Sequence, residues 1–491
     1  MNKYLNDRCI VSDDGVFFYD SEDEIKLEDL ERFIEWHSLT LVPKLNRYRE
    51  YYKGHNLGLK QLPPKPNNKP DNRIYSPYAK KLVDTFTGFA TGRPVKITLQ
   101  EDVAEDSLSK WNKSRKMDSV VSTVWKESSI YGRAFFYVYD DQSEIHVIDS
   151  DPRETFIVYD NTVAHKPLYA VRYGSRYQGN GYKITLYSPD KQWNIDTSQA
   201  NNMSSPVSNP FHFIPIVEVV ENDERVGIIE SVKSIIDALD KATSEKANDV
   251  DYFADAYLKV LGALLTDDEL KNLRDNRVIN LKSAVNDDEP VESLDVDFLS
   301  KPDADTTQEN LINRLTDLLY QMSMVVNLND KDFGNSTGVA LEMKYKPMLN
   351  SATLKSRAFG ESLKEMYQVV FASDQVPNIP GDAWEDLDIV FQYDMPHDLK
   401  DEAETAQTLS TLISRDTWLK SLSIVNDVRQ EEKNIDKEKQ ENMENNLQLL
   451  RQNNEITDGE ANGNGQGREA TDTVSAQSGS SDRLTGREDI Q

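Results

Sequence analysis

The sequence contains a single cysteine, Cys9, among 491 residues, and only six histidines. One cysteine excludes a disulfide within the chain and a thiolate metal cluster. The histidines are scattered, with no HxH or HExxH pair, so we expect no metal site and no cofactor. The first residues lack the apolar core of a signal peptide, and no stretch approaches the roughly 18 apolar residues that a membrane span needs. We therefore expect a protein that acts inside a cell, or in a particle assembled there.

Positive charge is scarce compared with negative charge. The chain has 56 Lys and Arg against 85 Asp and Glu, which gives a formal net charge of -29. An acidic surface repels duplex DNA, which carries about one negative charge per 1.7 Å. The charge thus excludes an ordinary DNA-binding protein, although it allows a protein that surrounds DNA without adhering to it. Solubility alone is the simplest explanation of the charge.

The first half of the chain changes from a helical to a strand pattern. Apolar residues recur at helical spacing in residues 27–53, 77–90 and 118–131. Short alternating segments separated by turn residues then predict strands. These strands are expected at residues 134–139, 144–148, 155–159, 168–173, 182–187 and 215–220. The pattern predicts an α+β domain with a mostly antiparallel sheet that extends to about residue 227.

Two helical stretches follow, at residues 231–265 and 309–328. The second places Leu311, Leu315, Leu318, Met322 and Val325 in a four-three alternation, which is typical of a helix that packs lengthwise on other helices. The middle of the first, ATSEKANDVD, has little apolar surface, so we expect that face to be solvated. The two stretches predict an antiparallel hairpin joined by residues 266–307, within which we expect a short helix at 267–275 and strands at 277–281 and 291–297.

The rest of the sequence predicts a long helix, a strand, a further helical region and a tail. Residues 339–371 predict a long helix interrupted near Pro347, and residues 387–392 predict a strand. Residues 400–450 are helical in pattern and highly charged. Residues 453–491 contain almost no apolar side chains, so this tail should be disordered, because it cannot offset the entropy cost of ordering.

The segment GNSTG at residues 334–338 matches the G-x-S-x-G pattern of a hydrolase nucleophile elbow, with Ser336 as the candidate nucleophile. A helix follows it as the elbow requires, but the preceding NLNDKDF is polar and does not resemble a buried strand. The alternative is a loop in which Ser336 or Thr337 caps the next helix. No Walker A pattern occurs, so the chain is not itself an ATPase motor.

Five segments of the chain form a recognisable set in this order: NRIYSPYAKKLVDTFTGFATGRP (72–94), IYGRAFFYVYDDQSEIHVID (130–149), PFHFIPIVEVVEN (210–222), GNSTGVALEMKYKPMLNSATLKSRAF (334–359) and LISRDTWLKSLSIVNDVRQEEKNIDKE (412–438). Together they resemble the portal proteins of long-tailed double-stranded DNA bacteriophages. The resemblance covers residues 20 to 450 approximately. It implies a ring-shaped oligomer, usually a dodecamer, at one vertex of the capsid of the virion, assembled in the host cytoplasm.

The resemblance also implies the portal architecture. The wing, an α+β domain, would comprise residues 1–227. The antiparallel stem helices would be residues 228–265 and 308–328, with a small α/β clip at 266–307 between them. Residues 329–394 would return to the wing with the channel helix and tunnel loop. A helical crown would occupy residues 395–452, followed by the disordered tail, residues 453–491.

In this family the ring is a channel for packaging and ejecting double-stranded DNA. Residues 330–338 and 346–351 both interrupt a helical pattern, so both are candidates for a loop that contacts DNA; the candidate residues are Asp330, Lys331, Asp332, Gly334, Asn335, Ser336, Gly338 and Lys346. The acidic turn Asp287, Asp288 and Glu289 is the candidate docking surface of the clip. Implied partners are the large terminase, head-completion (connector) proteins, the major capsid protein and scaffolding proteins.

Two alternatives to the portal assignment stay open from the sequence. One is an intracellular serine hydrolase that uses Ser336. The other is an acidic capsid or scaffold protein without a channel. The portal assignment predicts no catalytic residue and no membrane partner.

Overall fold

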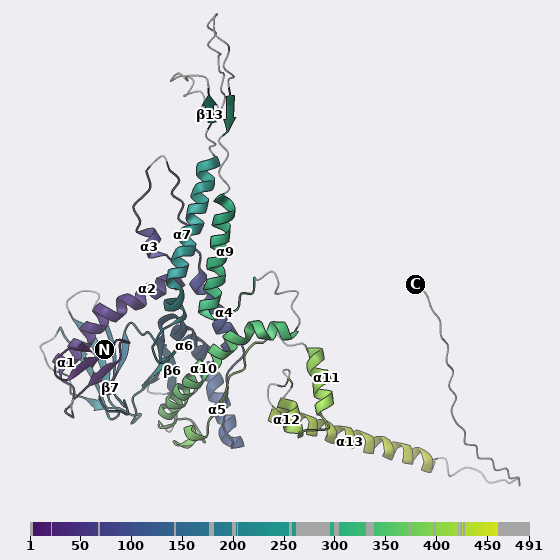
Figure 1. The fold of residues 1–491 in the computed structure, drawn as a ribbon. Helices are drawn as coiled ribbons and strands as arrows, with labels where there is room; N and C mark the ends of the chain where they lie inside the picture. Colours follow the sequence, from purple (N-terminus) through teal and green to yellow (C-terminus); the bar gives the residue numbers. More distant parts are fainter. Residues whose placement is uncertain are drawn as a thin grey trace, which may run out of the picture. The chain divides into compact units, whose positions relative to one another are not determined.

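The computed structural model (Figure 1) describes residues 3–20, 22–66, 69–141, 144–175, 181–198, 203, 205–254, 258–261, 295–298, 304–329, 338–373, 375–395, 399–420, 422, 425 and 428–459. The chain divides into two compact units, Met1–Pro396 and His397–Gln491.

The first unit begins with three short strands, the helices α1 to α6 and then the strands β5 to β12. In chain order the elements are β1 (Lys3–Tyr4), β2 (Cys9–Val11), β3 (Phe17–Tyr19), α1 (Leu27–Trp36), the π-helix η1 (His37–Leu41), α2 (Val42–Tyr52), α3 (Leu57–Lys60), α4 (Tyr78–Thr91), β4 (Lys96–Thr98), α5 (Asp102–Arg115), α6 (Met117–Tyr131), β5 (Arg133–Asp140), β6 (Ile145–Ser150), β7 (Thr155–Asp160), β8 (Pro167–Ser175), β9 (Tyr182–Tyr187), β10 (Lys191–Asp196), β11 (Val207–Ser208) and β12 (Ile216–Val220).

Long helices dominate the rest of this unit. They are α7 (Ile228–Ala254), α9 (Ala304–Ser323) and α10 (Gly338–Phe371), accompanied by β13 (Leu258–Leu261), β14 (Asp295–Phe298), the 3-10 helix η2 (Ala383–Asp386) and β15 (Asp388–Val390).

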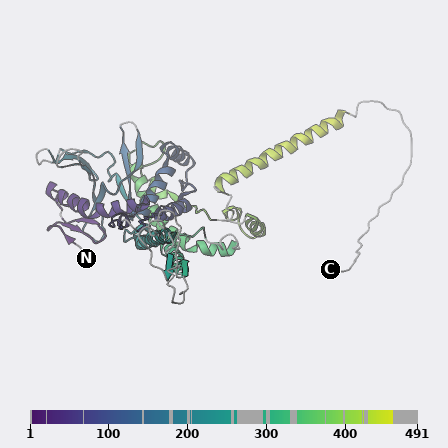
Figure 2. The ribbon, with the colours of Figure 1, turned by 90° about the horizontal axis from the view of Figure 1, so that it is seen from above.

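The largest sheet has the strand order β1-β2-β3-β7-β8-β9-β10-β11 and is antiparallel except where β3 pairs with β7. Successive side chains of β7 point to opposite faces. Phe156 and Val158 pack with Phe33 of α1, which lies along the sheet (Figure 2), whereas Ile157 packs with Phe135 and Ile216. The three-stranded sheet β12-β5-β6 therefore covers the face opposite to α1.

A second core is mostly helical and joins α2, α4, α6, α7 and α10 to the smaller sheet. Trp125 of α6 is fully buried at its centre. The Trp125 ring lies 5.8 Å from Phe86 of α4 and 5.2 Å from Phe359 of α10, measured between ring centroids. Aromatic rings at these separations attract one another in addition to excluding water. This core fixes the base of α7 and most of α10 against the same helix, α6.

A buried charge network connects the two sheets. Glu218 of β12 accepts hydrogen bonds from the Arg225 Nε at 3.0 Å and from the Tyr159 hydroxyl at 2.7 Å, and it lies 3.7 Å from the Arg133 guanidinium. Burial alone would raise the pKa of Glu218, but Arg225 and Arg133 outweigh burial and lower it to about 2. Glu218 is therefore ionised at neutral pH, and each charge in the network has a partner.

The end of α6 requires a glycine. Gly132 has a φ of +83°, and its N–H donates to the Ser128 carbonyl at 2.7 Å. A Cβ at this position would lie 1.9 Å from the carbonyl oxygen of Arg225. Only glycine combines the left-handed conformation with this close approach. The turn after β12 can therefore cross directly over the end of α6 and lead into α7.

The second unit contains α11 (Leu399–Leu409), α12 (Arg415–Lys420) and α13 (Val428–Gly459). The indole Nε1 of Trp418 donates to the Ala406 carbonyl at 2.7 Å, and Arg415 pairs with Asp436 at 3.2 Å. The prediction of charged helices from residue 400 is confirmed. The prediction that the disordered tail begins at residue 453 was wrong, because α13 continues to Gly459: each residue added to an existing helix gains a hydrogen bond at little further cost.

The structure confirms the α+β class and the six strands predicted between residues 134 and 220, together with the strand β15. It corrects the first helix of the hairpin, which ends at Ala254 rather than at residue 265. The apolar residues Leu258 and Val260, which were assigned to that helix, lie in β13, paired antiparallel with β14. Alternation of apolar and charged residues in Asp295–Phe298 matches this pairing. The helix at 267–275 and the strand at 277–281 lie outside the described residues.

We predict that Glu218→Gln destabilises the first unit by about 3–5 kcal/mol near neutral pH, because it leaves two buried arginines without their carboxylate. Since the folded pKa of Glu218 is lowered to about 2, its contribution is present above the unfolded pKa and is lost as the pH falls from about 4.5 towards 2. Urea unfolding across this range should show a smaller pH dependence in the variant. Glu224→Gln, at an exposed position, is the matched control. Equal stability of the two variants would contradict the assignment.

Candidate functional site

Helices α7 and α9 lie side by side as an antiparallel hairpin (Figure 1). Near the base, Leu239 and Leu319 are both fully buried in the helical core. Towards the other end the contacts become polar: the Gln308 amide donates to Asp249 at 2.5 Å, and Lys246 pairs with Glu309. The hairpin is therefore anchored by apolar packing at one end and by polar contacts towards the β13–β14 pair.

The apolar seam predicted on the second helix is only partly used within the chain. Leu319, which is outside the predicted seam, is buried, and its neighbours Ile312 and Leu315 pack against the core. Leu311 and Met322 of the predicted seam are each 51% exposed. The seam prediction was therefore right for Leu315 and Val325, which pack in the core, and wrong for Leu311 and Met322, because the helix carries apolar residues on two adjacent faces.

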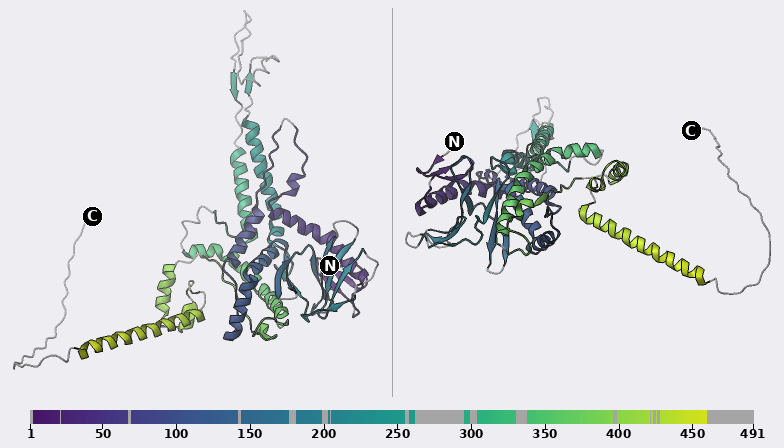
Figure 3. Two further views of the ribbon diagram at one scale, coloured as in Figure 1. Left: turned by 180° about the vertical axis from the view of Figure 1, so that it is seen from behind. Right: turned by 90° about the horizontal axis from the view of Figure 1, so that it is seen from below.

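Residues 61–66 and 69–77, which we call the strap, run alongside α7 (Figure 3, left). None of these described residues is in a helix or strand, so their backbone N–H groups need other acceptors. Side chains of α7 supply them: Ser76 N donates to Asp240 at 3.0 Å, Ile74 N to the Ser244 hydroxyl at 2.9 Å, and Asn72 N to the Asn248 side chain at 2.6 Å. The polar side chains of α7 thus hold an irregular segment of the same chain.

These contacts correct the prediction that the polar middle of the first stem helix faces water. Asp240, Ser244 and Asn248 are 2%, 2% and 5% exposed. They are four residues apart and so lie on one face of the helix. Burial is the main influence on the Asp240 carboxyl and raises its pKa, while hydrogen bonds from Asn56 and Ser76 act in the opposite sense. The sequence contains this four-residue repeat of polar residues, but only the position of the strap shows what it binds.

Helix α2 adds a second line of contacts to the base of α7. The Tyr48 hydroxyl donates to Glu230, and the Tyr51 hydroxyl donates to Asp237 at 2.7 Å. Burial is the first reason that the pKa of each tyrosine is raised, so both hydroxyls stay protonated and donate. The carboxylates of Glu230, Asp237 and Asp240 on α7 therefore accept hydrogen bonds from α2 and the strap.

Helix α10 is fixed by a buried lysine. The Lys355 ammonium donates to the Trp125 carbonyl at 2.9 Å and to the Ser129 hydroxyl at 2.7 Å, pairs with Glu221, and lies 4.2 Å from the centre of the Trp125 ring. Burial lowers the pKa of Lys355 to about 8, and Glu221 opposes this change. The ammonium links α10 to α6 and to the end of β12.

Helix α10 runs through residues 346–351 without a break, so the interruption predicted there was wrong. Pro347 has no N–H to donate to the carbonyl of Met343, but both residues are exposed, and water can therefore solvate the unpaired carbonyl. Lys346 is exposed on the first half of this helix. It is a candidate for contact with a ligand from a helix rather than from a loop.

Of the remaining candidate residues, Gly338 is the first residue of α10. The others lie outside the described residues, as does His397, the only histidine downstream of the G-x-S-x-G serine; they are Asp287, Asp288, Glu289, Asp330, Lys331, Asp332, Gly334, Asn335 and Ser336. In the described part of the chain no group of three His, Cys, Asp or Glu side chains is arranged to hold a metal ion. The described helices include none with the length and hydropathy of a membrane span.

Comparison with known proteins gave two findings. The family model described as "Phage portal protein, SPP1 Gp6-like" matches residues 31–445. The portal protein of Bacillus phage SPP1 is 22% identical over 404 residues, which cover 76% of this chain and 77% of that protein. The family match includes α2 to α12, and with them the hairpin, the strap and α10.

We predict that Ser244→Ala loosens the strap. The change removes the acceptor of the Ile74 N–H, and because this hydrogen bond is only partly buried we expect a cost of about 1 kcal/mol, at the lower end for an unsatisfied donor. Limited trypsin digestion should then cleave after Arg73 about five times faster or more, since Lys65 and Lys69 are each followed by a proline that blocks trypsin, while the second unit is digested at an unchanged rate. Ser234→Ala, at an exposed serine of the same helix, is the control. The interpretation fails if both variants are cleaved at the wild-type rate.

Proposed function

Because the chain belongs to the SPP1 Gp6-like phage portal proteins, and so serves as a portal for phage DNA, we propose that twelve copies form a closed ring at one vertex of the capsid. Genomic double-stranded DNA would be packaged and ejected through the central channel. The observation that carries the proposal is a family match that extends through both units of the chain, residues 31–445. Portal proteins are structural proteins, and we propose no catalytic role for Ser336.

We propose that the parts of the chain correspond to the parts of a portal. The two sheets and the helical core would form the wing, together with α10. Helices α7 and α9 would form the stem, with the clip between Ala254 and Ala304. The second unit would be the crown. Compared with the boundaries expected from the sequence, the clip gains the strand β13 and the stem helices become residues 228–254 and 304–323.

The acidic chain suits a channel through which DNA must slide. Tight binding of DNA depends on basic side chains that displace counterions from phosphates, and a surface without such groups offers DNA no fixed site. We propose that residues 330–338 border the channel, with Lys346 nearby on α10 as a transient phosphate contact. The acidic turn at residues 287–289 would lie at the clip end and dock the large terminase during packaging and a head-completion protein afterwards.

The same assignment implies which proteins the chain contacts and where it assembles. The wing and crown would contact the major capsid protein and scaffolding proteins during assembly in the host cytoplasm, and the finished ring would remain in the virion. Residues 460–491, which follow α13, would be dispensable for ring formation, because their composition offers no apolar surface for an interface.

We predict that the purified protein forms rings at micromolar concentration. Twelve copies of a 56.0 kDa chain would have a mass of about 670 kDa. Native mass spectrometry should give this mass or that of a ring with a similar number of subunits, and negative-stain images should show a central hole. A stable monomer at physiological salt would contradict the ring, and compact particles without a hole would favour an acidic scaffold protein.

We predict that replacing Asp330 and Asp332 with lysine slows DNA packaging without preventing ring assembly. The double substitution adds fixed cations near the proposed constriction in every subunit, and phosphates should dwell at them. Packaging rate in a reconstituted motor assay and duplex binding at physiological salt are the measurements. The pair Asp223→Lys and Glu224→Lys, at exposed positions, changes the net charge equally and is the control. If the first pair packages at the control rate and Lys346→Ala also has no effect, neither segment borders the channel.

A further inference from the structure

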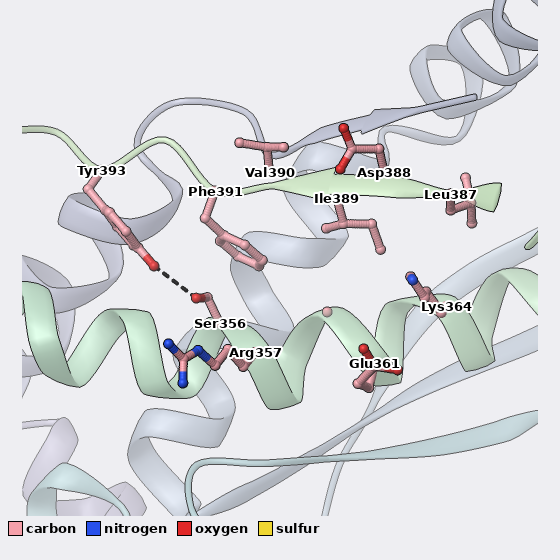
Figure 4. A pocket seen from close by; sticks show the side chains of 11 residues that line it. Ser356, Arg357, Glu361, Lys364, Leu387, Asp388, Ile389, Val390, Phe391 and Tyr393 are labelled. Carbon is pink, nitrogen blue, oxygen red and sulfur yellow. Dashed lines mark hydrogen bonds between the residues drawn. The ribbon is translucent and has the colours of Figure 1, made fainter. Parts of the chain in front are cut away.

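A groove of about 380 Å³ separates α10 from β15 in the first unit (Figure 4). One wall is the stretch of α10 from Ser356 to Lys364, and the other is β15 with its flanking residues. A hydrogen bond of 2.8 Å between the Ser356 and Tyr393 hydroxyls closes one end. The groove is open to solvent along its length.

The groove lies along a single strand, β15, and reaches its backbone. Five consecutive residues, Leu387 to Phe391, line it. Figure 4 shows the Ile389 and Phe391 side chains turned toward α10 and those of Asp388 and Val390 turned away, so a groove that touches all five residues reaches the backbone of β15 as well as one of its faces. Within the described residues β15 pairs with β4 on one edge and with no further strand. An unpaired edge presents N–H and C=O groups to which another extended segment can bond.

The opposite wall contains a glycine that the chain itself does not need. Gly360 lies inside α10, where glycine is less favourable than alanine by about 1 kcal/mol. A Cβ placed on Gly360 would have no atom within 4 Å. Neither a positive φ nor a close contact within the described chain therefore explains the glycine. The absence of a side chain widens the groove at the height of β15 and leaves room for the backbone of an incoming segment.

The charges of the groove favour a protein partner over DNA. Arg357 and Lys364 are balanced by Glu361 and Asp388, so the lining has no net charge. A site for DNA phosphates would be basic. Apolar surface is also available nearby, because Leu354 and Val390 are 66% and 44% exposed. Balanced charges beside exposed apolar side chains suit a segment of ordinary protein composition.

We propose that this groove is a contact between subunits, in which an extended segment of a second copy of this chain adds a strand to the open edge of β15 and passes over Gly360. The proposal rests on the ring proposed above, which supplies a neighbouring copy in a fixed orientation to every subunit. In a ring each subunit offers one surface to the copy on one side and a different surface to the copy on the other. Backbone hydrogen bonds would give affinity, and the groove would fix the register.

The test is Gly360→Leu, which fills the groove. In the single chain this leucine has open space and a better helix propensity than glycine, so the melting temperature of the subunit should not fall. Assembly should require at least ten times more protein than in the wild type, measured by mass photometry over a dilution series. Gly88→Leu is the matched control, because Gly88 also lies inside a helix and has no atom within 4 Å of an added Cβ.

Hydrogen exchange gives a second measurement that does not depend on a variant. The backbone amides of residues 388–391 should exchange more slowly in the assembled wild type than in the dissociated chain. The proposal is overturned if Gly360→Leu assembles like the wild type, if Gly88→Leu is impaired as much, or if these amides gain no protection on assembly. In those cases the wild type still forms rings and the proposed function stands. A wild type that never assembles would instead overturn the ring, and the groove contact with it.

Discussion

The fold of the first unit depends on two carboxylates at β12. Glu218 holds Arg133 and Arg225 together with Tyr159 of the large sheet, while Glu221 pairs with Lys355 of α10. Buried charges are costly unless every partner is present, so these contacts admit one arrangement of the surrounding elements and penalise others. Both sheets, α6 and α10 meet at this strand, and the base of α7 follows it directly. Helix α7 is therefore positioned by electrostatics as well as by packing.

Structural features that depend on residues close together in the sequence were predicted well. The alternation in residues 134–220 identified six strands, and helical spacing identified α4 and α6 within about one residue of their bounds. The α+β class and the helical hairpin were both inferred from these strand and helix periodicities. Family resemblance then supplied the function, which the periods alone could not provide, because a helical hairpin beside an α+β domain occurs in proteins with many roles.

Features that depend on distant segments were not predicted. The polar face of α7 gave no indication that the strap covers it, since the contacts join positions about 170 residues apart. The strands β1 to β3 are too short to show an alternation of apolar and polar residues in the sequence. They are ordered by pairing with one another and with β7. Pro347 was expected to interrupt a helix, but an exposed proline costs one hydrogen bond that water can replace.

Pro347 also separates α10 into two parts that differ in how they are held by the rest of the first unit. From Ala352 onwards the helix is held in the core by Lys355, Phe359 and Leu363, whereas the part before the proline exposes Met343 and Lys346 and reaches the core through Tyr345, whose ring lies 6.0 Å from that of Phe89. The missing hydrogen bond lies at the junction of the two parts, so bending of the helix costs least there. A force applied to the first turns of α10 would bend the helix at Pro347 and strain the contact between Tyr345 and Phe89, while the part from Ala352 onwards kept its position.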